Sequence, residues 1–237
     1  MAMPLAQSRV LVVGVGGIGC PLAEAIAPHV ASMTLVDPDV VDPSNLHRQI
    51  LYTEADVGRP KVEVAKDRLR GRLASVRAVK ARLTSDNAME LFAGHDLVLE
   101  GADNFGTKFL CADAALLAGT PIVHAAAVAW HGTVLSVAAG GGPCYRCIFE
   151  DMPKGGAPNC ATAGVMGPVV GVVSAIALSL AAGLLESDAS GVFASFDGKT
   201  DAFRMRTMRG RASCVLCGPR RRIRSLDEPR YREAACA

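Results

Sequence analysis

Residues 10–19 read VLVVGVGGIG, four apolar residues followed by a glycine-rich turn. The apolar run predicts a buried strand. Gly14, Gly16 and Gly19 have the GxGxxG spacing, in which the first glycine permits a tight turn, the second admits a phosphate to the backbone and the last lets helix and strand pack closely. The helix that follows would direct free N–H groups and its positive dipole end at the phosphate. This segment predicts a nucleotide site on an α/β fold.

An acidic residue follows where a ribose contact is expected. Met33–Val36 predicts a second strand, and Asp37 comes directly after it. A carboxylate about 20 residues beyond the glycine turn is placed to accept hydrogen bonds from ribose hydroxyls. The candidate nucleotide-binding residues of this region are Gly14, Gly16, Gly17, Gly19 and Asp37. Taken alone, this set fits an NAD-dependent oxidoreductase as well as an ATP-using enzyme.

Donors and cations further along the chain favour ATP. Asn45 and Arg48 lie in the segment NLHRQ, residues 45–49, and Lys61 follows Pro60 at the start of a helical pattern. An adenylating enzyme needs positive charge near the β and γ phosphates, which leave, whereas a redox enzyme only holds its pyrophosphate in place. We therefore expect Asn45 to bind the nucleotide, and Arg48 and Lys61 to bind it and to act in catalysis.

Asp103 and Asn104 come just after a predicted strand, Asp96–Leu99. Open α/β sheets bind their ligands at the carboxyl ends of the strands. A carboxylate there could hold Mg²⁺, which binds through one or two carboxylates and the substrate phosphates. The alternative is an ordinary helix N-cap, since Asp and Asn both serve that purpose. Both roles stay open at this point.

Strand-like and helical segments alternate through the first half of the chain. This alternation predicts a Rossmann-like, doubly wound sheet, and the short connection at Trp130-His131-Gly132 adds an antiparallel C-terminal part, so the sheet is mixed. The expected strands are Val10–Val13, Met33–Val36, Val76–Val79, Asp96–Leu99, Ile122–Val128, Val134–Ala138, Gly191–Phe196 and Ala202–Met205, the last two joined by a tight Asp197-Gly198 turn. The expected helices are Pro21–Ala27, Pro60–Leu73, Ser85–Leu91 and Thr107–Leu117.

Charge is distributed unevenly along the 237 residues. Residues 1–218 are expected to form one domain, and 219–237 a basic C-terminal tail, because ten of the arginines lie between residues 204 and 237 against three acidic residues there. A solvated tail is the favoured interpretation, docking of a partner protein is second, and nucleic-acid binding is third because only Tyr231 could stack on a base.

One stretch, Ala163–Leu185, has no charged residue and is long enough to span a membrane. Pro168 near its start, several glycines and the lack of aromatic residues at its ends instead favour a helix buried in the core or in a subunit interface. No apolar segment of signal-peptide length precedes Val10. We expect no membrane association and a cytoplasmic location.

Two CxxC pairs, Cys144–Cys147 and Cys214–Cys217, predict a metal site. Each pair can hold one ion through two thiolates, and two pairs complete a tetrahedral four-cysteine zinc clasp that joins the middle of the chain to its end. Because all four positions would be sulfur, the zinc would be structural. A redox-active CxxC pair is the less favoured alternative. Cys160 stands apart in a glycine-rich loop before the long apolar segment, where a plain loop cysteine and a nucleophile are equally compatible with the spacing.

In combination, these motifs resemble the MoeB/ThiF family (HesA/MoeB/ThiF), adenylyltransferases related to the ubiquitin-activating enzymes. The matching segments are the glycine turn, Asp37, Asn45–Gln49, Gly58–Lys61, Asp103-Asn104, Pro143–Cys147, Gly164–Pro168 and Cys214–Cys217. The resemblance implies that Mg·ATP adenylates the C-terminal Gly-Gly carboxylate of a small ubiquitin-fold sulfur-carrier protein. The acyl-adenylate then receives sulfur and becomes a thiocarboxylate.

The resemblance also implies roles for particular residues. The glycines would line the nucleotide, Asp37 would hold the ribose, and Asp103 would position magnesium. Asn45, Arg48 and Lys61 would contact the phosphates, and Cys160 would occupy the position of a loop cysteine that family members use in different ways. A homodimer is implied, with a heterodimer as the alternative, and the sulfur donor is expected to be a separate protein because no further domain follows Cys217.

One departure from the family concerns the N-terminal segment. Family members carry an arginine-containing helix before the first strand, and one of its arginines reaches the partner subunit's ATP site. The residues before Arg9 do not match that segment. The alternative is therefore a subunit of the same fold that needs a second chain to complete its ATP site.

Overall fold

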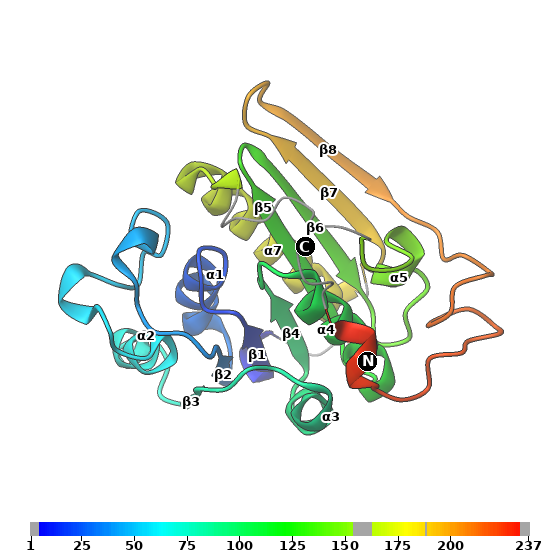
Figure 1. Cartoon of the computed structure of the whole chain (residues 1–237), viewed down its shortest axis with the longest axis horizontal. Coiled ribbons are helices and arrows are strands. Elements are labelled where there is room, and N and C mark those ends of the chain that lie inside the picture. Colours follow the sequence, from blue (N-terminus) through cyan, green and yellow to red (C-terminus); the bar gives the residue numbers. More distant parts are fainter. Residues whose placement is uncertain (1–4, 154–162, 188, 233–237) are drawn as a thin grey trace.

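The computed structural model describes residues 5–153, 163–187 and 189–232 of the chain. Its centre is an eight-stranded sheet with the order β3-β2-β1-β4-β5-β6-β7-β8 (Figure 1). The strands are β1 (Arg9–Val13), β2 (Ser32–Val36), β3 (Val76–Val79), β4 (Leu97–Glu100), β5 (Ile122–Val128), β6 (His131–Val137), β7 (Val192–Asp197) and β8 (Ala202–Thr207). Strands β1 to β5 are parallel and β5 to β8 are antiparallel, so the predicted mixed, doubly wound sheet is confirmed.

Helices cover both faces of the parallel part of the sheet (Figure 1). The longer ones are α1 (Gly19–Ile26), α2 (Lys61–Leu69), α3 (Ser85–Ala93), α4 (Phe105–Ala118) and α7 (Gly167–Ser187), and α5 (Tyr145–Ile148) is a single turn. Along β1, Val10 and Val12 pack in the core cluster with α1, α2 and α7, while Leu11 and Val13 pack in the cluster with α3 and α4. A strand buried on both faces is apolar throughout, which explains the uninterrupted run before the glycine turn.

Three local expectations were wrong in detail. Helix α2 ends at Leu69 rather than Leu73, since Gly71 favours helix termination. The residues His131 and Gly132 belong to β6 and pair with β5, so the hairpin turn is shorter than expected. The last hairpin closes at Asp197 and Ala202, which leaves a four-residue loop instead of a two-residue Asp-Gly turn.

Helix α7 is a core helix. It packs against β5, β6 and α1, and residues such as Val173, Ala177 and Ala181 are fully buried, as predicted. Its length and composition alone would allow it to cross a membrane, but half of its most apolar stretch is buried inside the protein. Met166, directly before the helix, and Val172 within it remain exposed.

The basic C-terminal segment is partly folded onto the domain. Ile223 and Tyr231 are buried in the same core cluster as α4, and the segment runs beside that helix (Figure 1, red). Asp113 of α4 accepts hydrogen bonds from the Tyr231 hydroxyl at 2.9 Å and from Arg146 Nε at 2.7 Å. The expectation of a solvated tail is therefore wrong for the residues that make these contacts.

Tyr231→Phe is expected to lower the free energy of unfolding by about 1 kcal/mol, because it removes the buried hydrogen bond to the Asp113 carboxylate together with a longer one, 3.3 Å, that the hydroxyl accepts from Arg230 Nη1. Urea denaturation followed by circular dichroism measures the change. Tyr145→Phe is the matched control, since the Tyr145 hydroxyl has no partner among the residues described and its loss should cost only a few tenths of a kcal/mol, as is usual for changes away from such contacts. Equal stabilities for the wild type and Tyr231→Phe would show that the segment contributes no such anchor.

Candidate functional site

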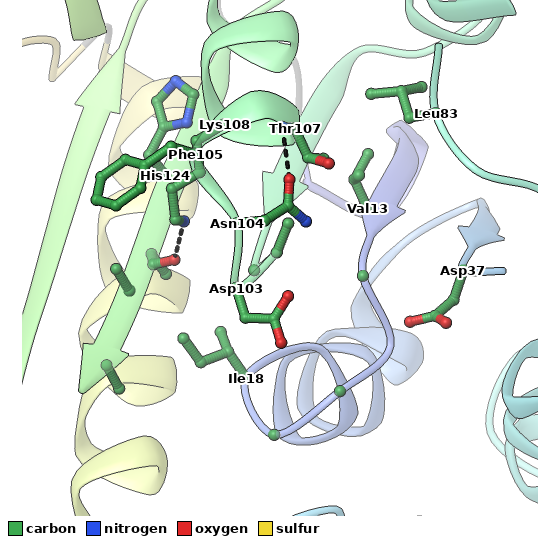
Figure 2. A pocket seen from close by; sticks show the side chains of 18 of the residues that line it. Val13, Ile18, Asp37, Leu83, Asp103, Asn104, Phe105, Thr107, Lys108 and His124 are labelled. Carbon is green, nitrogen blue, oxygen red and sulfur yellow. Dashed lines mark hydrogen bonds between the residues drawn. The ribbon is translucent and has the colours of Figure 1, made fainter. Parts of the chain in front are cut away.

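A cavity of about 440 Å³ opens at the carboxyl ends of β1, β2, β4 and β5 (Figure 2). This edge of the sheet is where open α/β folds bind ligands. The sequence-predicted site residues in its wall are Gly14, Gly16, Gly17, Asp37, Arg48, Lys61, Asp103 and Asn104. Gly19 and Asn45 are not part of the wall. The structure thus brings most of the candidate residues, from five separate segments, into one space.

Glycine is needed at different positions of the turn for different structural reasons. Gly14 has a φ of +83°, and a Cβ there would lie 3.2 Å from the Ala102 nitrogen on the neighbouring strand end. A Cβ on Gly19 would lie 1.9 Å from the Gly14 oxygen, so this glycine is required for the turn to close against α1. At Gly16 and Gly17 the space opens into the cavity, bounded by side chains of Gln49 and Arg48. The turn therefore leaves room for a ligand beside the backbone.

Asp37 is fixed in orientation by the backbone. Its carboxylate accepts hydrogen bonds from Val15 N at 2.7 Å and Asp39 N at 2.9 Å. Burial raises the pKa of Asp37 above its ordinary value, although Lys61 and the two N–H donors oppose that shift. Each carboxylate oxygen still has a lone pair free to accept a hydrogen bond, which suits a diol such as ribose.

Arg48 lies over the glycine turn and is supported by Asn45. Its guanidinium donates to Asn45 Oδ1 at 2.5 Å, and its aliphatic chain lies 3.4 Å from where a Gly17 Cβ would be. Asn45 thus positions Arg48 in this structure and does not reach the cavity itself. The arrangement places a permanent positive charge next to the exposed backbone of the turn.

Lys61 brings a second positive charge to the wall. Its Nζ donates to Asp39 Oδ2 at 2.9 Å, and its side chain is 6% exposed whereas that of Asp39 is 60% exposed. A largely exposed carboxylate gives a weak ion pair, because water screens it. A phosphate oxygen could therefore replace Asp39 as the acceptor for this ammonium group at small cost.

Of the two roles considered for Asp103 and Asn104, magnesium ligand and helix N-cap, each fits only one of the two residues. Asn104 is the N-cap of α4, and its Oδ1 accepts a hydrogen bond from Thr107 N at 2.8 Å (Figure 2). Asp103 does not cap the helix, and among the residues described its carboxylate forms no hydrogen bond or ion pair. It lines the cavity between the glycine turn and β5. A free carboxylate in this place fits the oxygen donor that Mg²⁺ prefers.

Sequence reasoning missed a buried charged cluster at the inner end of the cavity. Glu100, which is fully buried, accepts hydrogen bonds from Lys108 Nζ at 3.0 Å and His124 Nδ1 at 3.0 Å. Lys108 and His124 also line the cavity, as do Tyr145 of α5 and Phe149 directly after that helix. The sequence did contain one signal of this cluster, which is Glu100 at the end of an apolar predicted strand. An acidic residue in such a buried place rarely lacks a partner, so a cation or another donor could have been expected near it.

Burial and ion pairing shift the pKa of Glu100 in opposite directions. Burial raises the pKa of this carboxyl group, but Lys108 and His124 outweigh it, and the pKa ends below its ordinary value. Burial lowers the pKa of His124, and the hydrogen bond to Glu100 offsets only part of that change. At neutral pH the cluster therefore holds an ionised Glu100 beside a neutral His124.

The four cysteines of the two CxxC pairs meet as predicted. The Sγ atoms of Cys144, Cys147, Cys214 and Cys217 all lie within 4.8 Å of one another. A tetrahedral zinc site with Zn–S bonds of about 2.3 Å requires sulfur atoms about 3.8 Å apart, so the cluster fits a four-cysteine zinc clasp. It ties the turn before α5 to the segment after β8. Cys160, which the sequence left as either a catalytic cysteine or a plain loop cysteine, and Cys236 lie outside the residues described.

Comparisons with known proteins agree with this geometry. The model of the ThiF family matches residues 3–216. The chain is 40% identical to the sulfur carrier protein adenylyltransferase of Thermus thermophilus over 242 residues, covering 97% of this chain and 86% of the relative. It is 42% identical to the mouse adenylyltransferase and sulfurtransferase MOCS3 over 233 residues, covering 94% of this chain but only 50% of MOCS3.

Solved structures show the same fold. The crystal structure of E. coli MccB with ATP superposes with a TM-score of 0.76 at 21% identity, covering 90% of this chain and 68% of MccB. At this identity the likeness extends to the fold alone. The expected alternative of an NAD-dependent oxidoreductase does not fit the relatives, which are adenylyltransferases by name.

Proposed function

The chain belongs to the ThiF family and is an adenylyltransferase of the MoeB and ThiF type, and from this premise we propose its substrate and reaction. The enzyme adenylates the C-terminal Gly-Gly carboxylate of a small ubiquitin-fold sulfur-carrier protein. The observation that carries the proposal is the cavity that unites the glycine turn, Asp37, Arg48, Lys61 and Asp103. Apolar residues of β5 and β6, among them Val128 and Leu135, line the same cavity, and we assign this part of it to the carrier's extended C-terminal segment.

The first step needs no protein nucleophile. A carboxylate oxygen of the carrier attacks the α-phosphorus of ATP, the bond between that phosphorus and the bridging oxygen breaks, and pyrophosphate leaves with the electron pair. Arg48 and Lys61 stabilise the charge that develops on the phosphates, while Asp37 fixes the ribose and so the position of the α-phosphate. Such positioning and electrostatic stabilisation account for large rate enhancements in phosphoryl and nucleotidyl transfer.

Two metals fit the residues present. Asp103 would hold Mg²⁺, with Asn104 beside it, and the ion would neutralise charge on the departing phosphates. Zinc would occupy the four-cysteine cluster and, with no open coordination position, would be structural.

In the second stage a thiolate displaces AMP from the acyl-adenylate, and we assign that thiolate to Cys160, which thereby forms a thioester with the carrier. Sulfide-level sulfur from a separate donor protein then attacks the thioester carbonyl, the Cys160 thiolate leaves, and the carrier is released as the thiocarboxylate. We further propose a homodimer in the cytoplasm. The exposed Ile50, Met166 and Val172 offer apolar surface for a second subunit.

Carrier-dependent ATP–pyrophosphate exchange tests the proposal. The purified protein is incubated with Mg·ATP, labelled pyrophosphate and each of a panel of small ubiquitin-fold carriers that end in Gly-Gly. Exchange should require one of the carriers and should disappear when its last two glycines are removed. Exchange without any carrier, or ATP binding without exchange by any carrier in the panel, would count against this substrate. Exchange that appears only after a second chain is added would favour the heterodimer.

Lys61→Ala is expected to reduce kcat/KM for ATP in this assay by about a hundredfold, because a buried cation that contacts the leaving phosphates is lost. Lys66→Ala is the matched control, since Lys66 lies on the same helix outside the cavity and should leave kcat/KM unchanged. An equal, small effect of both substitutions would remove Lys61 from the phosphate site.

A further inference from the structure

The buried cluster at the inner end of the cavity has one unused hydrogen-bonding position. Lys108 Nζ donates all its protons, to the two Glu100 oxygens at 3.1 and 3.0 Å and to Ala125 O at 2.8 Å. Glu100 also accepts from Ala102 N at 2.6 Å and from His124 at 3.0 Å. The remaining ring nitrogen, His124 Nε2, is buried and has no partner among the residues described. A buried polar atom without a partner carries a cost that a bound ligand can remove.

The neighbours of His124 determine which kind of group could fill that position. Glu100 is ionised and can only accept, so His124 Nδ1 must carry the proton and donate it. In a neutral imidazole the other nitrogen, Nε2, is then a hydrogen-bond acceptor. The missing partner is therefore an N–H or O–H donor. A carboxylate or a phosphate, which only accept, would not satisfy it.

The position of His124 in the sheet places it at the end of the cavity opposite Asp37, the proposed ribose-binding residue. This end would receive the terminal glycine of the carrier and is called the acyl end here. Asp37 follows β2 and His124 lies on β5, and the order β2-β1-β4-β5 separates them by three strand spacings, about 14 Å. Figure 2 shows these two residues on opposite sides of the cavity with Asp103 between them. Next to His124 the wall is apolar and aromatic, with the Tyr145 ring 4.6 Å from the imidazole and Phe149 4.8 Å from Tyr145. Such a wall suits a peptide rather than a nucleotide phosphate.

We propose that His124 is a positioning residue for the carrier: its Nε2 accepts a hydrogen bond from the last peptide N–H of the carrier's C-terminal segment. That N–H belongs to the terminal glycine, whose carboxylate must meet the α-phosphate. The hydrogen bond holds the glycine by its backbone, and Glu100 and Lys108 hold the imidazole in the orientation that allows it. This inference rests on the proposed function, because it assumes that a peptide terminus enters the cavity.

A double-mutant cycle tests the proposed hydrogen bond, by combining substitution of His124 with methylation of the terminal glycine nitrogen of the carrier. The carrier that supports exchange is prepared by semisynthesis with glycine or N-methylglycine as its last residue, and N-methylglycine lacks the N–H. In the wild type, methylation should lower kcat/KM for the carrier by about tenfold, the value of one buried hydrogen bond. In His124→Phe the same methylation should have little further effect. The steric cost of the methyl group is common to both enzymes and cancels in the comparison.

A second variant distinguishes loss of the Nε2 acceptor from loss of the hydrogen bond that Nδ1 donates to Glu100. His124→Asn keeps a donor near the position of Nδ1 but has no acceptor at the position of Nε2, and it should behave like His124→Phe towards the methylated carrier. KM for ATP should be unchanged in both variants. An equal penalty for methylation in the wild type and in both variants would overturn the proposal, while carrier-dependent exchange would still support the proposed function.

The tautomer of His124 can be measured without any carrier. Nitrogen-15 NMR of protein labelled at histidine, with His124→Asn used to assign the signal, should show a protonated Nδ1 and an unprotonated Nε2 at neutral pH. A protonated Nε2 would overturn the proposal directly. If no carrier supports exchange, the proposed function fails, and this spectrum still decides whether the acceptor exists.

Discussion

Asp103→Ala is expected to lower the rate of carrier-dependent ATP–pyrophosphate exchange by about a thousandfold, at the upper end of what the loss of one group that stabilises transition-state charge costs. Asp103 lines the cavity between the glycine turn and β5, and no described residue engages its carboxylate. Without it, Mg²⁺ would lose its protein ligand and the leaving pyrophosphate its neutralising charge. Affinity for ATP should change much less, since the glycine turn, Arg48 and Lys61 remain.

The controls for this prediction come from the same region. Asp86→Ala removes an exposed carboxylate at the start of α3, outside the cavity, and should leave the exchange rate unchanged. The melting temperature of Asp103→Ala should also stay near that of the wild type, because Asn104 and not Asp103 caps α4. Near-normal exchange by Asp103→Ala would mean that magnesium is held elsewhere or is not required.

Much of the fold could be predicted because its signals are local. The run Val10–Val13 is apolar at every position because both faces of β1 are covered, and the glycine turn after it needs glycine for steric reasons at Gly14 and Gly19. The two CxxC pairs were equally easy to recognise, since two residues between cysteines place both thiolates of a pair on one side of a tight turn. In each case a short stretch of sequence contains the whole physical requirement.

The residues that were missed depend on contacts that no short stretch contains. Glu100, Lys108 and His124 come from β4, α4 and β5, and they meet only because the strand register sets Glu100 opposite His124. Tyr231 reaches Asp113 across 118 residues of sequence, within a segment whose composition alone favours solvation. Asn45 and Asp103 show the same limit on a smaller scale. Their residue types indicated a polar site, but only the structure shows that Asn45 supports Arg48 and that the Asp103 carboxylate has no partner within the described part of the chain.

The four-cysteine cluster does more than join two distant segments, because the two residues inside its first CxxC pair both contact other parts of the protein. Tyr145 packs on His124 in the cavity wall, with ring centroids 4.6 Å apart. Arg146, which is buried, donates to Asp113 of α4 at 2.7 and 2.9 Å. Loss of the metal would free the turn that holds both side chains. The acyl end of the cavity should therefore depend on zinc more strongly than the nucleotide end.

Cys214→Ser is accordingly expected to abolish bound zinc, which elemental analysis measures as about one ion per chain in the wild type. The melting temperature should fall by about 10 °C, since several kcal/mol of folding energy reside in a structural zinc site and each kcal/mol corresponds to about 2–4 °C in a chain of this size. KM for the carrier should rise more than KM for ATP, because Tyr145 borders the acyl end. Cys111→Ala, a buried cysteine outside the cluster, should keep the zinc. Full zinc content and unchanged stability in Cys214→Ser would show that the four sulfur atoms are not a metal site.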